Sequence, residues 1–245
     1  MSVTDPVTPV LFPLGQDGIL VRFGDGFAPN PEKALACGAT VRAAGLAGVA
    51  EVATSLASVY VRFDPARVTR GALADRLRNL IALPRSPSPT EGTRLWEVPA
   101  SFGGDTGPQL AEAASLAGLS PDAAVAEIAA TELSVLAIGF APGQPYLGHL
   151  PDGWNMPRQT ALTPQVPAGA LVVALRQIVL FANPSPTGWR WIGTCGFQPF
   201  SATRSDPFAL RAGDRVRLVP TDAATVAELA TRHDGLGGAT CTVTP

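Results

Sequence analysis

The chain has 245 residues, of which 46% are hydrophobic, and its formal net charge is −2 at pH 7. This length and apolar content suffice for one large core or two modest cores, and we take two domains as the working hypothesis. Because the charge is close to neutral, no basic surface would displace counterions from nucleic acid, and we exclude nucleic acid as a partner.

The N-terminus has no charged leader followed by an apolar block, and no apolar run reaches the about 18 residues of a membrane span. The sequence therefore predicts a soluble, cytoplasmic protein with no membrane partner.

The chain has three cysteines, Cys37, Cys195 and Cys241. Their odd number and wide spacing argue against a disulfide framework and against a metal site. We expect all three to be buried thiols.

Residues 1–84 show a regular alternation of strand and helix patterns. Strands are predicted over 19–23, 49–53 and 58–63, the last with Val59, Val61 and Phe63 on one face. Helices are predicted from Pro31 and over 69–83. A strand near 95–98 would close the order βαββαβ, which predicts a small α+β domain of the ferredoxin-like type.

Residues 84–93 have the sequence PRSPSPTEGT, with three prolines and no apolar periodicity. Such a stretch cannot contribute a packed face, and we interpret residues 85–93 as a linker.

Residues 94–245 show a different sequence pattern. Pro108 and the Ser120–Pro121 pair each suit the start of a helix, and a further helix over 222–232, capped by Thr221 or Asp222, would plug or flank the domain. Between these helices, short β-rich runs alternate with proline and glycine clusters, as in a compact β-barrel. The runs cover residues 134–140, 170–174, 178–182, 189–193, 215–219 and 240–244.

One loop, GFAPGQPYLGHLP over residues 139–151, follows the first of these runs. Its prolines restrict φ at three positions, and Gly143 and Gly148 permit a positive φ or a close approach of a ligand. Stiff, glycine-lined loops at the mouth of a barrel make good binding surfaces. The alternative is a proline-rich corner that only turns the chain.

This loop occurs together with VPAG at 166–169, SPTGW at 185–189 and GDRV at 213–216. In this order the motifs resemble the family of the 5-oxoprolinase B subunit, which is also called allophanate hydrolase subunit 1 and includes the Kip-type inhibitors of histidine kinases. The resemblance extends over nearly the whole chain. It implies that residues 94–245 form a cyclophilin-like β-barrel.

The resemblance also implies a function. The chain would be one component of an ATP-dependent amide (lactam) hydrolase, active only in complex with a carboxyltransferase-type C subunit, that opens 5-oxoproline to glutamate. ATP would be bound by this chain or by its partner subunits. The alternative is a non-catalytic regulatory module similar to the Kip-type inhibitors, with a histidine kinase as its partner.

Arg158 is the first choice for an anion contact, because Pro157 fixes the backbone before it. Tyr146 would offer a stacking face and a hydroxyl. The alternative for Arg158 is an exposed arginine on the barrel rim. The alternative for Tyr146 and Trp189 is packing in the core. The alternative for His149 is a loop residue without a role in binding. The candidate substrate-binding residues are Phe140, Pro142, Gly143, Pro145, Tyr146, His149, Arg158, Gln177 and Trp189.

Several positions depart from the pattern of the family. Gln177 matches the glutamine of its Gly-Gly-Gln-Thr-Gly segment, but Leu175 and Arg176 replace the glycines, which argues against an anion cradle of backbone N–H groups there. Polar family residues are also replaced, so the lining is thinned and no catalytic residue is assigned. These replacements are at Ile128, Thr163, Gln165, Thr194 and Cys195.

Overall fold

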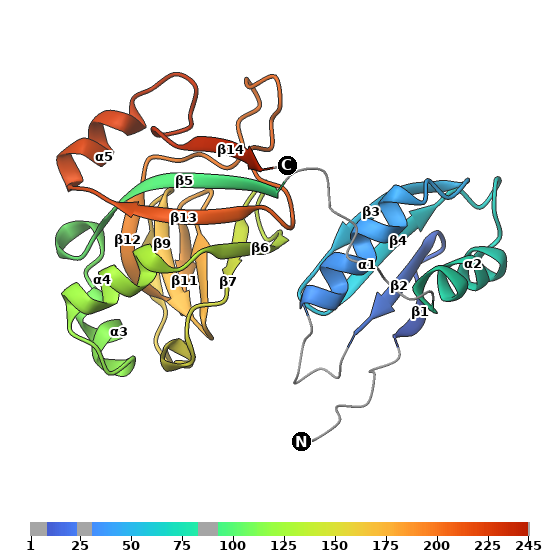
Figure 1. Cartoon of the computed structure of the whole chain (residues 1–245), viewed down its shortest axis with the longest axis horizontal. Coiled ribbons are helices and arrows are strands. Elements are labelled where there is room, and N and C mark those ends of the chain that lie inside the picture. Colours follow the sequence, from blue (N-terminus) through green and yellow to red (C-terminus); the bar gives the residue numbers. More distant parts are fainter. Residues whose placement is uncertain (1–8, 24–30, 83–92, 245) are drawn as a thin grey trace. The chain divides into compact units, whose positions relative to one another are not determined.

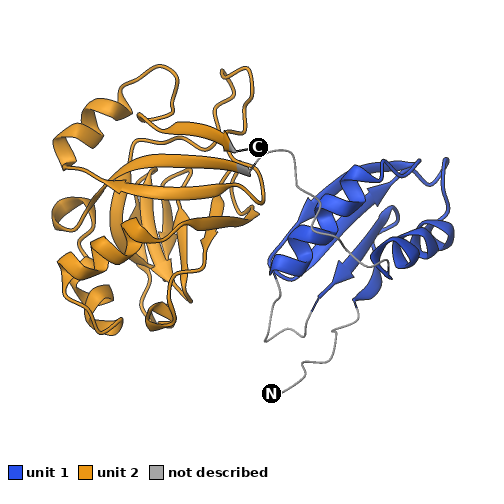
Figure 2. Cartoon of the chain, in the orientation of Figure 1, with its two compact units in different colours: residues 1–90 blue, residues 91–245 orange. Residues whose placement is uncertain are grey.

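The computed structural model describes residues 9–23, 31–82 and 93–244. The chain divides into two compact units, residues 1–90 and 91–245, which are described separately below (Figure 2). The predicted linker lies outside the described residues except for Thr93, which begins a strand of the second unit.

The first unit contains a four-stranded antiparallel sheet in the order β1-β2-β4-β3, with two helices (Figure 1). The three strands and two helices predicted for this unit are confirmed, and Pro31 is the first residue of its helix. The elements are β1 (Val10–Leu14), β2 (Gly18–Arg22), α1 (Pro31–Ala43), β3 (Val49–Thr54), β4 (Ser58–Phe63) and α2 (Arg70–Ala82).

Both helices pack on one face of this sheet. Side chains alternate along a strand, so every second residue of β2 and β4 points toward the helices. The buried residues that share this core are Ile19, Val21, Phe23, Ala34, Cys37, Val41, Val59, Val61, Phe63, Val68, Leu73 and Leu77.

The strand predicted near 95–98 does not close this sheet. It lies in the second unit, and β1, which the sequence did not predict, forms a hairpin with β2 and takes the outer position. The observed order is ββαββα, and the ferredoxin-like assignment is not confirmed. The sequence signal of β1 is weak because three of its five residues, Val10, Phe12 and Leu14, are exposed and apolar, which hides the alternation of a half-buried strand.

The second unit contains a closed, seven-stranded β-barrel. Its strands follow each other in the ring order β12-β9-β10-β7-β6-β13-β5, and β12 pairs with β5 to complete the ring (Figure 1). The ring strands are β5 (Thr93–Phe102), β6 (Leu133–Ile138), β7 (Pro145–Gly148), β9 (Ala170–Ala174), β10 (Gln177–Leu180), β12 (Arg190–Cys195) and β13 (Arg215–Pro220).

Ring closure depends on the length of β5. Its first half pairs with β14 (Thr240–Thr244), whereas Ala100, Ser101 and Phe102 at its end pair with β12 along the same edge. Alternate residues of all seven strands then fill the interior. The strand residues of this buried core are Trp96, Val98, Ala100, Leu133, Val135, Leu147, Leu171, Val173, Ile178, Leu180, Ile192, Cys195, Val216 and Leu218.

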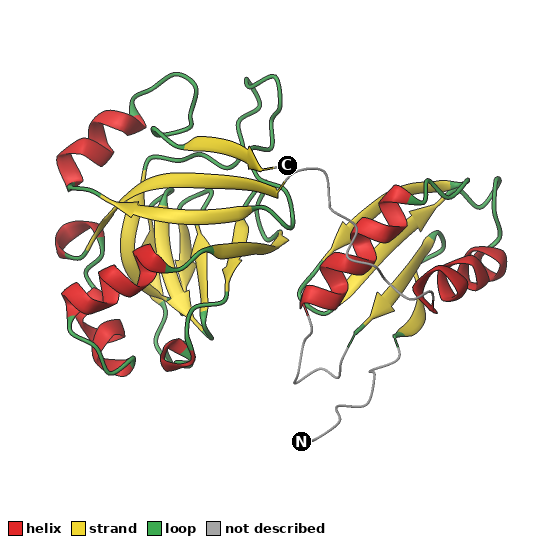
Figure 3. Ribbon diagram, in the orientation of Figure 1, coloured by secondary structure: helices red, strands yellow, loops and turns green. Residues whose placement is uncertain are grey.

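Helices lie at the periphery of the barrel strands (Figure 3). The predicted caps are confirmed, because the side chains of Ser120 and Asp222 accept hydrogen bonds from the backbone N–H of Ala123 and Thr225. No helix within the described ranges is both long and apolar enough to cross a membrane. The remaining elements are α3 (Leu110–Leu116), α4 (Pro121–Ala130), α5 (Ala223–Ala230), the 3-10 turns Gly104–Thr106 and Asp152–Trp154, and the small sheet of β8 (Thr163–Val166) with β11 (Ser185–Thr187).

The cap of α5 makes the stability of this unit depend on pH. Thr225 donates two hydrogen bonds of 2.8 Å to the Asp222 carboxylate, one from its backbone N–H and one from its hydroxyl, and these bonds lower the pKa of Asp222 below its ordinary value of 3.8. A lowered pKa in the folded state means that this stabilisation is complete above 3.8 and is lost as the pH falls through the folded-state value.

We therefore expect Asp222→Asn, which keeps one acceptor oxygen, to be less stable than the wild type at neutral pH, because it loses the charge-assisted part of the cap. The difference should shrink as the pH is lowered past 3.8. Urea unfolding of both proteins across this pH range measures it. A difference that stays constant at all pH values would contradict the assignment.

The cysteines differ in exposure. Cys37 and Cys195 are buried, but Cys241 on β14 is exposed, so the prediction of three buried thiols is wrong for Cys241. β14 pairs only with the first half of β5, and its position beside the barrel leaves Cys241 accessible. Burial raises the pKa of the Cys195 thiol to about 12. Burial also raises the pKa of Cys241, and the nearby Arg94 opposes this shift.

Iodoacetamide should therefore alkylate Cys241 in the native protein, faster as the pH rises, while Cys37 and Cys195 react only after unfolding. Peptide mass spectrometry of native and denatured samples identifies the modified residues. Cys241→Ser serves as the control and should remove the native-state reaction. Alkylation of Cys195 in the folded protein would show that the barrel interior opens.

Candidate functional site

The proline-rich loop singled out in the sequence forms the turn between β6 and β7. Its backbone is closed by hydrogen bonds from Gly139 N to Gln144 O, 3.0 Å, and from Gln144 N to Ala141 O, 3.1 Å. Phe140 and Gly143 have φ angles of 73° and 72°, and the prediction of a positive φ at Gly143 is confirmed. Pro142 lies within this tight hairpin turn and Pro145 begins β7, so the segment is not an open loop.

Gly143 also sits at a close approach of two chain segments. A Cβ at this position would lie 2.9 Å from both the Cβ of Phe200 and the carbonyl oxygen of Pro199. Only glycine fits both the space and the φ angle. The β6–β7 turn is thereby packed against residues 199–200.

A second apolar cluster covers the outside of the barrel over β7, β9 and β10. Alternation along β9 and β10 turns Leu171, Val173 and Ile178 inward, and their neighbours outward. We call the outward set the outer aromatic cluster. It contains the buried residues Val166, Ala170, Val172, Ala174, Val179, Phe181 and Trp189, with Tyr146 and Trp191 packed against them.

Three of the predicted site residues meet on this cluster. The rings of Tyr146 and Trp189 are 6.3 Å apart, edge to face, and the guanidinium carbon of Arg158 lies 5.3 Å from the centre of the Trp189 ring. Trp189 is 7% exposed, whereas Arg158 is exposed. An arginine over a tryptophan face is attracted by the ring quadrupole, by about 0.5–1 kcal/mol at an exposed site. Trp189 is buried in the cluster, as its core-packing alternative predicts, and a role of these three residues in ligand binding stays a prediction.

The segment that carries Arg158 is anchored at Pro157. The carbonyl oxygen of Pro157 accepts a hydrogen bond of 2.8 Å from Nη1 of Arg190, a residue that is 8% exposed. Nε of Arg190 forms an ion pair of 2.8 Å with Glu112 on α3. A buried cation with both a carboxylate and a carbonyl partner is held in one geometry.

Gln159 anchors the other side of Arg158. Its backbone N–H donates to Gly188 O at 2.6 Å, and its side chain donates to Trp189 O at 3.0 Å. Gln109 donates in turn to Oε1 of Gln159 at 2.7 Å. With both neighbours of Arg158 bound to fixed groups, the arginine is presented to solvent over Trp189 with little backbone freedom.

Hydrogen-bonding capacity remains unused at this place. Among residues 9–23, 31–82 and 93–244, no hydrogen bond or ion pair involves the Arg158 guanidinium or the Tyr146 hydroxyl. A guanidinium donates only, and a phenol can donate as well. Two donors beside an aromatic wall suit a small ligand that has a carboxylate or carbonyl group and a flat apolar part.

The other predicted residues are distributed around this centre. Phe140 is 76% exposed and its ring meets Phe181 of the outer aromatic cluster at 6.4 Å, edge to face. Gln177 is 8% exposed and pairs with Gly148, so it lies on the same face as Tyr146, two residues along the strands. His149 is exposed just beyond β7, where the Gly148–His149 peptide is cis.

The two predicted prolines of the turn lie apart from the centre. Pro142 is exposed, whereas Pro145 is buried at the start of β7. Leu147 points into the barrel interior. Pro145 lies two residues earlier on the same strand and therefore faces the same side. As ligand contacts, all nine candidate residues stay predictions.

The turn between β9 and β10 does not form an anion cradle. Leu175 and Arg176 have φ angles of 52° and 62°, which glycines would adopt more easily. Their N–H groups are already used, because Leu175 N donates to Met156 O at 2.8 Å and Arg176 N donates to Trp154 O at 3.0 Å. The two N–H groups are therefore not free to bind an anion, as the replacement of the glycines suggested.

The replaced family positions supply no acid–base chemistry. Ile128 is fully buried in the core, and Cys195 has a raised pKa inside the barrel. The Thr194 hydroxyl donates to Thr106 O at 2.8 Å. In the described part of the chain, no three His, Cys, Asp or Glu side chains are grouped so that they could hold a metal ion.

The location of the site differs from the prediction. The sequence placed it at the barrel mouth, but Tyr146 points outward from the middle of β7, so the candidate site lies on the outer wall. We expected the site at the barrel mouth because the loop follows a strand. Which side chains of β7 face the interior depends instead on how β7 pairs with β6 and β10. The positioning residues Gln109, Gln159 and Arg190 were missed, since their contacts join segments far apart in the sequence.

Comparison with known proteins places the chain in a family. A family model described as carboxyltransferase domain, subdomain C and D, matches residues 9–210. The 5-oxoprolinase B subunit of Escherichia coli O157:H7 is 38% identical over 128 residues, or 52% of this chain and 59% of that protein. The 5-oxoprolinase B subunit of Bacillus subtilis (strain 168) is 36% identical over 126 residues, or 51% and 52%. The chain thus spans about half the length of these relatives.

Solved structures show the same fold in other chains. TTHA0988 is 32% identical with a TM-score of 0.69, and the match covers 84% of this chain and 40% of that chain. The uncharacterised protein PH0987 from Pyrococcus horikoshii is 26% identical with a TM-score of 0.51, over 88% and 99%. The K. lactis urea amidolyase shares the fold alone, with 13% identity and a TM-score of 0.73 over 98% and 17%. On the strength of the family-model match, this chain belongs to the carboxyltransferase domain, subdomain C and D, family.

Proposed function

We propose that this chain is the component of an ATP-dependent lactam hydrolase that corresponds to the 5-oxoprolinase B subunit, and that it opens 5-oxoproline to glutamate together with a carboxyltransferase-type C subunit. The observation that carries the proposal is the convergence of Arg158, Tyr146 and Trp189 on the outer wall of the barrel, in a chain similar to 5-oxoprolinase B subunits.

The chemistry of 5-oxoproline suits this convergence. The molecule has a carboxylate, a lactam carbonyl and a flat five-membered ring. The Arg158 guanidinium would bind the carboxylate, the Tyr146 hydroxyl would donate to the carbonyl oxygen, and Trp189 would form the apolar wall. The side chain of Gln177 lies on the same face and would offer a further polar contact.

The residues of the β9–β10 turn do not fit the phosphates of ATP. Its two N–H groups donate to the carbonyls of Met156 and Trp154, so they cannot also bind an anion. We propose that the partner subunits bind ATP, since this turn offers no free N–H groups for its phosphates. The proposed role of this chain is to bind and orient the lactam.

The assembled complex tests this function. We expect this chain, purified with the C subunit and any further subunits of the hydrolase, to release glutamate from 5-oxoproline only when ATP is present. Omission of this chain is the control and should abolish the release. A complex that assembles but neither releases glutamate nor binds 5-oxoproline would contradict the proposal and favour the regulatory alternative.

A substitution at Arg158 tests the site. Arg158→Gln should raise the KM for 5-oxoproline at least about tenfold, because a hydrogen bond to a charged group contributes about 1.5–3 kcal/mol. Arg158→Lys should recover part of this loss, since it keeps the charge without the planar fork. Arg78→Gln, which removes an exposed guanidinium from α2, is the matched control. An unchanged KM in Arg158→Gln would remove Arg158 from the site.

A further inference from the structure

Three phenylalanines gather where the β6–β7 turn meets the loop over residues 199–209. Phe208 is 45% exposed and its ring packs on Phe200, with 5.0 Å between centroids. Phe140 is 76% exposed in the turn that Gly143 packs against residues 199–200. We call Phe140, Phe200 and Phe208 the phenylalanine patch. Phe200 is half-buried, whereas Phe140 and Phe208 are exposed, and exposed aromatic side chains near one another mark interaction surfaces.

Phe140 is held in an unfavourable backbone conformation. Its φ of 73° lies in the left-handed region, where bulky residues are rare and glycine is readily accommodated. The residue gains little from burial, because most of its side chain faces solvent. A strained and exposed aromatic residue contributes little to folding, which favours a role outside the folded chain.

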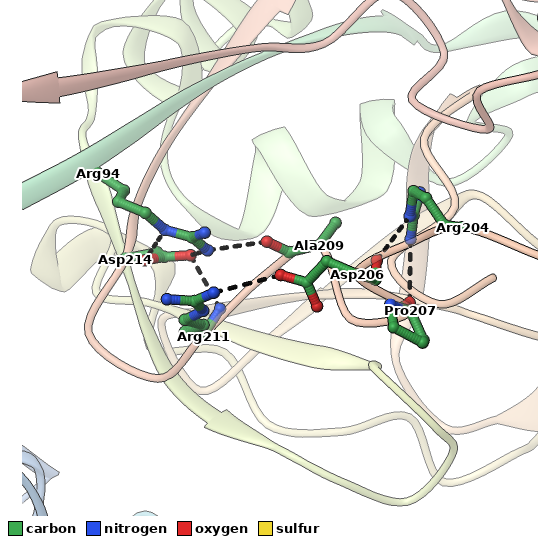
Figure 4. Close-up of polar contacts among 7 residues, drawn as sticks. All are labelled: Arg94, Arg204, Asp206, Pro207, Ala209, Arg211 and Asp214. Atoms are coloured by element: carbon green, nitrogen blue, oxygen red, sulfur yellow. Dashed lines mark hydrogen bonds and ion pairs between the residues drawn. The ribbon is translucent and has the colours of Figure 1, made fainter. Parts of the chain in front are cut away.

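The loop that carries Phe208 is fastened by backbone contacts. Ser201 N donates to Pro207 O at 2.9 Å and Ala209 N donates to Pro199 O at 3.0 Å, on either side of the bridge between Phe200 and Phe208. The Arg204 guanidinium donates to Pro207 O at 3.1 Å (Figure 4). It also donates to Gln198 O at 3.1 Å.

An ion pair fixes the end of the same loop. Arg94 at the start of β5 donates through Nε to Asp214 at 2.9 Å and through Nη2 to Ala209 O at 2.8 Å (Figure 4). The Asp214 carboxylate also accepts from Arg211 N at 2.8 Å. The GDRV motif thus anchors the loop and does not take part in the candidate site. A preshaped apolar surface loses little entropy when a partner binds.

The charged residues on and beside the loop over residues 199–209 already have partners. Arg211 forms an ion pair with Asp206 at 3.2 Å, and Arg204 is bound to backbone carbonyls (Figure 4). The matching surface of a partner should therefore be an apolar pocket without a dominant charge.

The comparisons favour a different polypeptide as the occupant. In TTHA0988 the matched region is 40% of the chain, so further polypeptide accompanies this fold there, and the curated relatives are described as subunits. We propose that the phenylalanine patch is the docking surface for the C subunit, with Phe140 inserted into an apolar pocket of that partner. The inference rests on the proposed function for the identity of the partner.

The strain at Phe140 allows a clean test. Phe140→Gly removes the aromatic ring and relieves the backbone, so the variant should unfold at the same or a higher temperature than the wild type. Its Kd for the purified C subunit, measured by titration calorimetry, should nevertheless rise about tenfold or more. Phe208→Ser should weaken binding as well.

Leu175→Gly is a matched control. Leu175 is also apolar, 44% exposed and in the left-handed region, with a φ of 52°, but it lies in the β9–β10 turn. This variant should bind the C subunit with wild-type affinity. Binding of Phe140→Gly with wild-type affinity, or equal weakening in Leu175→Gly, would overturn the inference. The inference would also be overturned if the wild-type chain did not bind the C subunit. Self-association of the chain through the patch, measured by light scattering, would overturn it as well.

The outcome can be separated from that of the proposed function. If Phe140→Gly no longer binds the C subunit while the wild-type complex releases no glutamate, the docking surface stands and the hydrolase proposal fails. If Arg158→Gln keeps its affinity for the C subunit but loses turnover, the two sites are independent.

Discussion

Strand β5 hydrogen-bonds to three other strands, with β13 along one edge and β14 and β12 in succession along the other. The ring closes because the end of β5 is left available to β12. Once the ring is closed, one set of alternating side chains must fill the interior and the other must face outward. The outer aromatic cluster, and with it the candidate site, is a consequence of this closure.

In the candidate site, the flexible side chain of Arg158 is attached to a backbone segment that is held in place. An exposed arginine has many rotamers, and holding it in place costs conformational entropy. Here the cost is reduced because Pro157 and Gln159 are each bound to buried or backbone groups, and because Trp189 supplies a face for the guanidinium. The contacts come from α3, from residues 188–191 and from the segment around Arg158, which ring closure brings together.

Among the described residues, three that are not glycine have a positive φ, and these have different consequences. Leu175 and Arg176 make a tight turn whose N–H groups bind the carbonyls of Met156 and Trp154, and this removes an anion site. Phe140 makes a turn that exposes a large ring. Strain of this kind persists where the surrounding structure determines the backbone, as the packing of Gly143 against residues 199–200 does here.

The local elements could be predicted from the sequence: the helices that begin at Pro31 and Pro121, the caps Ser120 and Asp222, the alternating strand at 58–63 and the β-rich strand at 170–174. These depend on periodicity and on caps within a few residues, which a sequence displays directly. Tyr146, Arg158 and Trp189 were among the nine candidates that the sequence motifs suggested, but their contact with one another was not predicted. The sequence could not show that residues 95–98 belong to the barrel or that the candidate site lies on its outer wall. It also could not show that Gln109, Gln159 and Arg190 hold the segment around Arg158. Those outcomes depend on which strand edges pair and on contacts between distant segments, and neither is encoded in a local pattern.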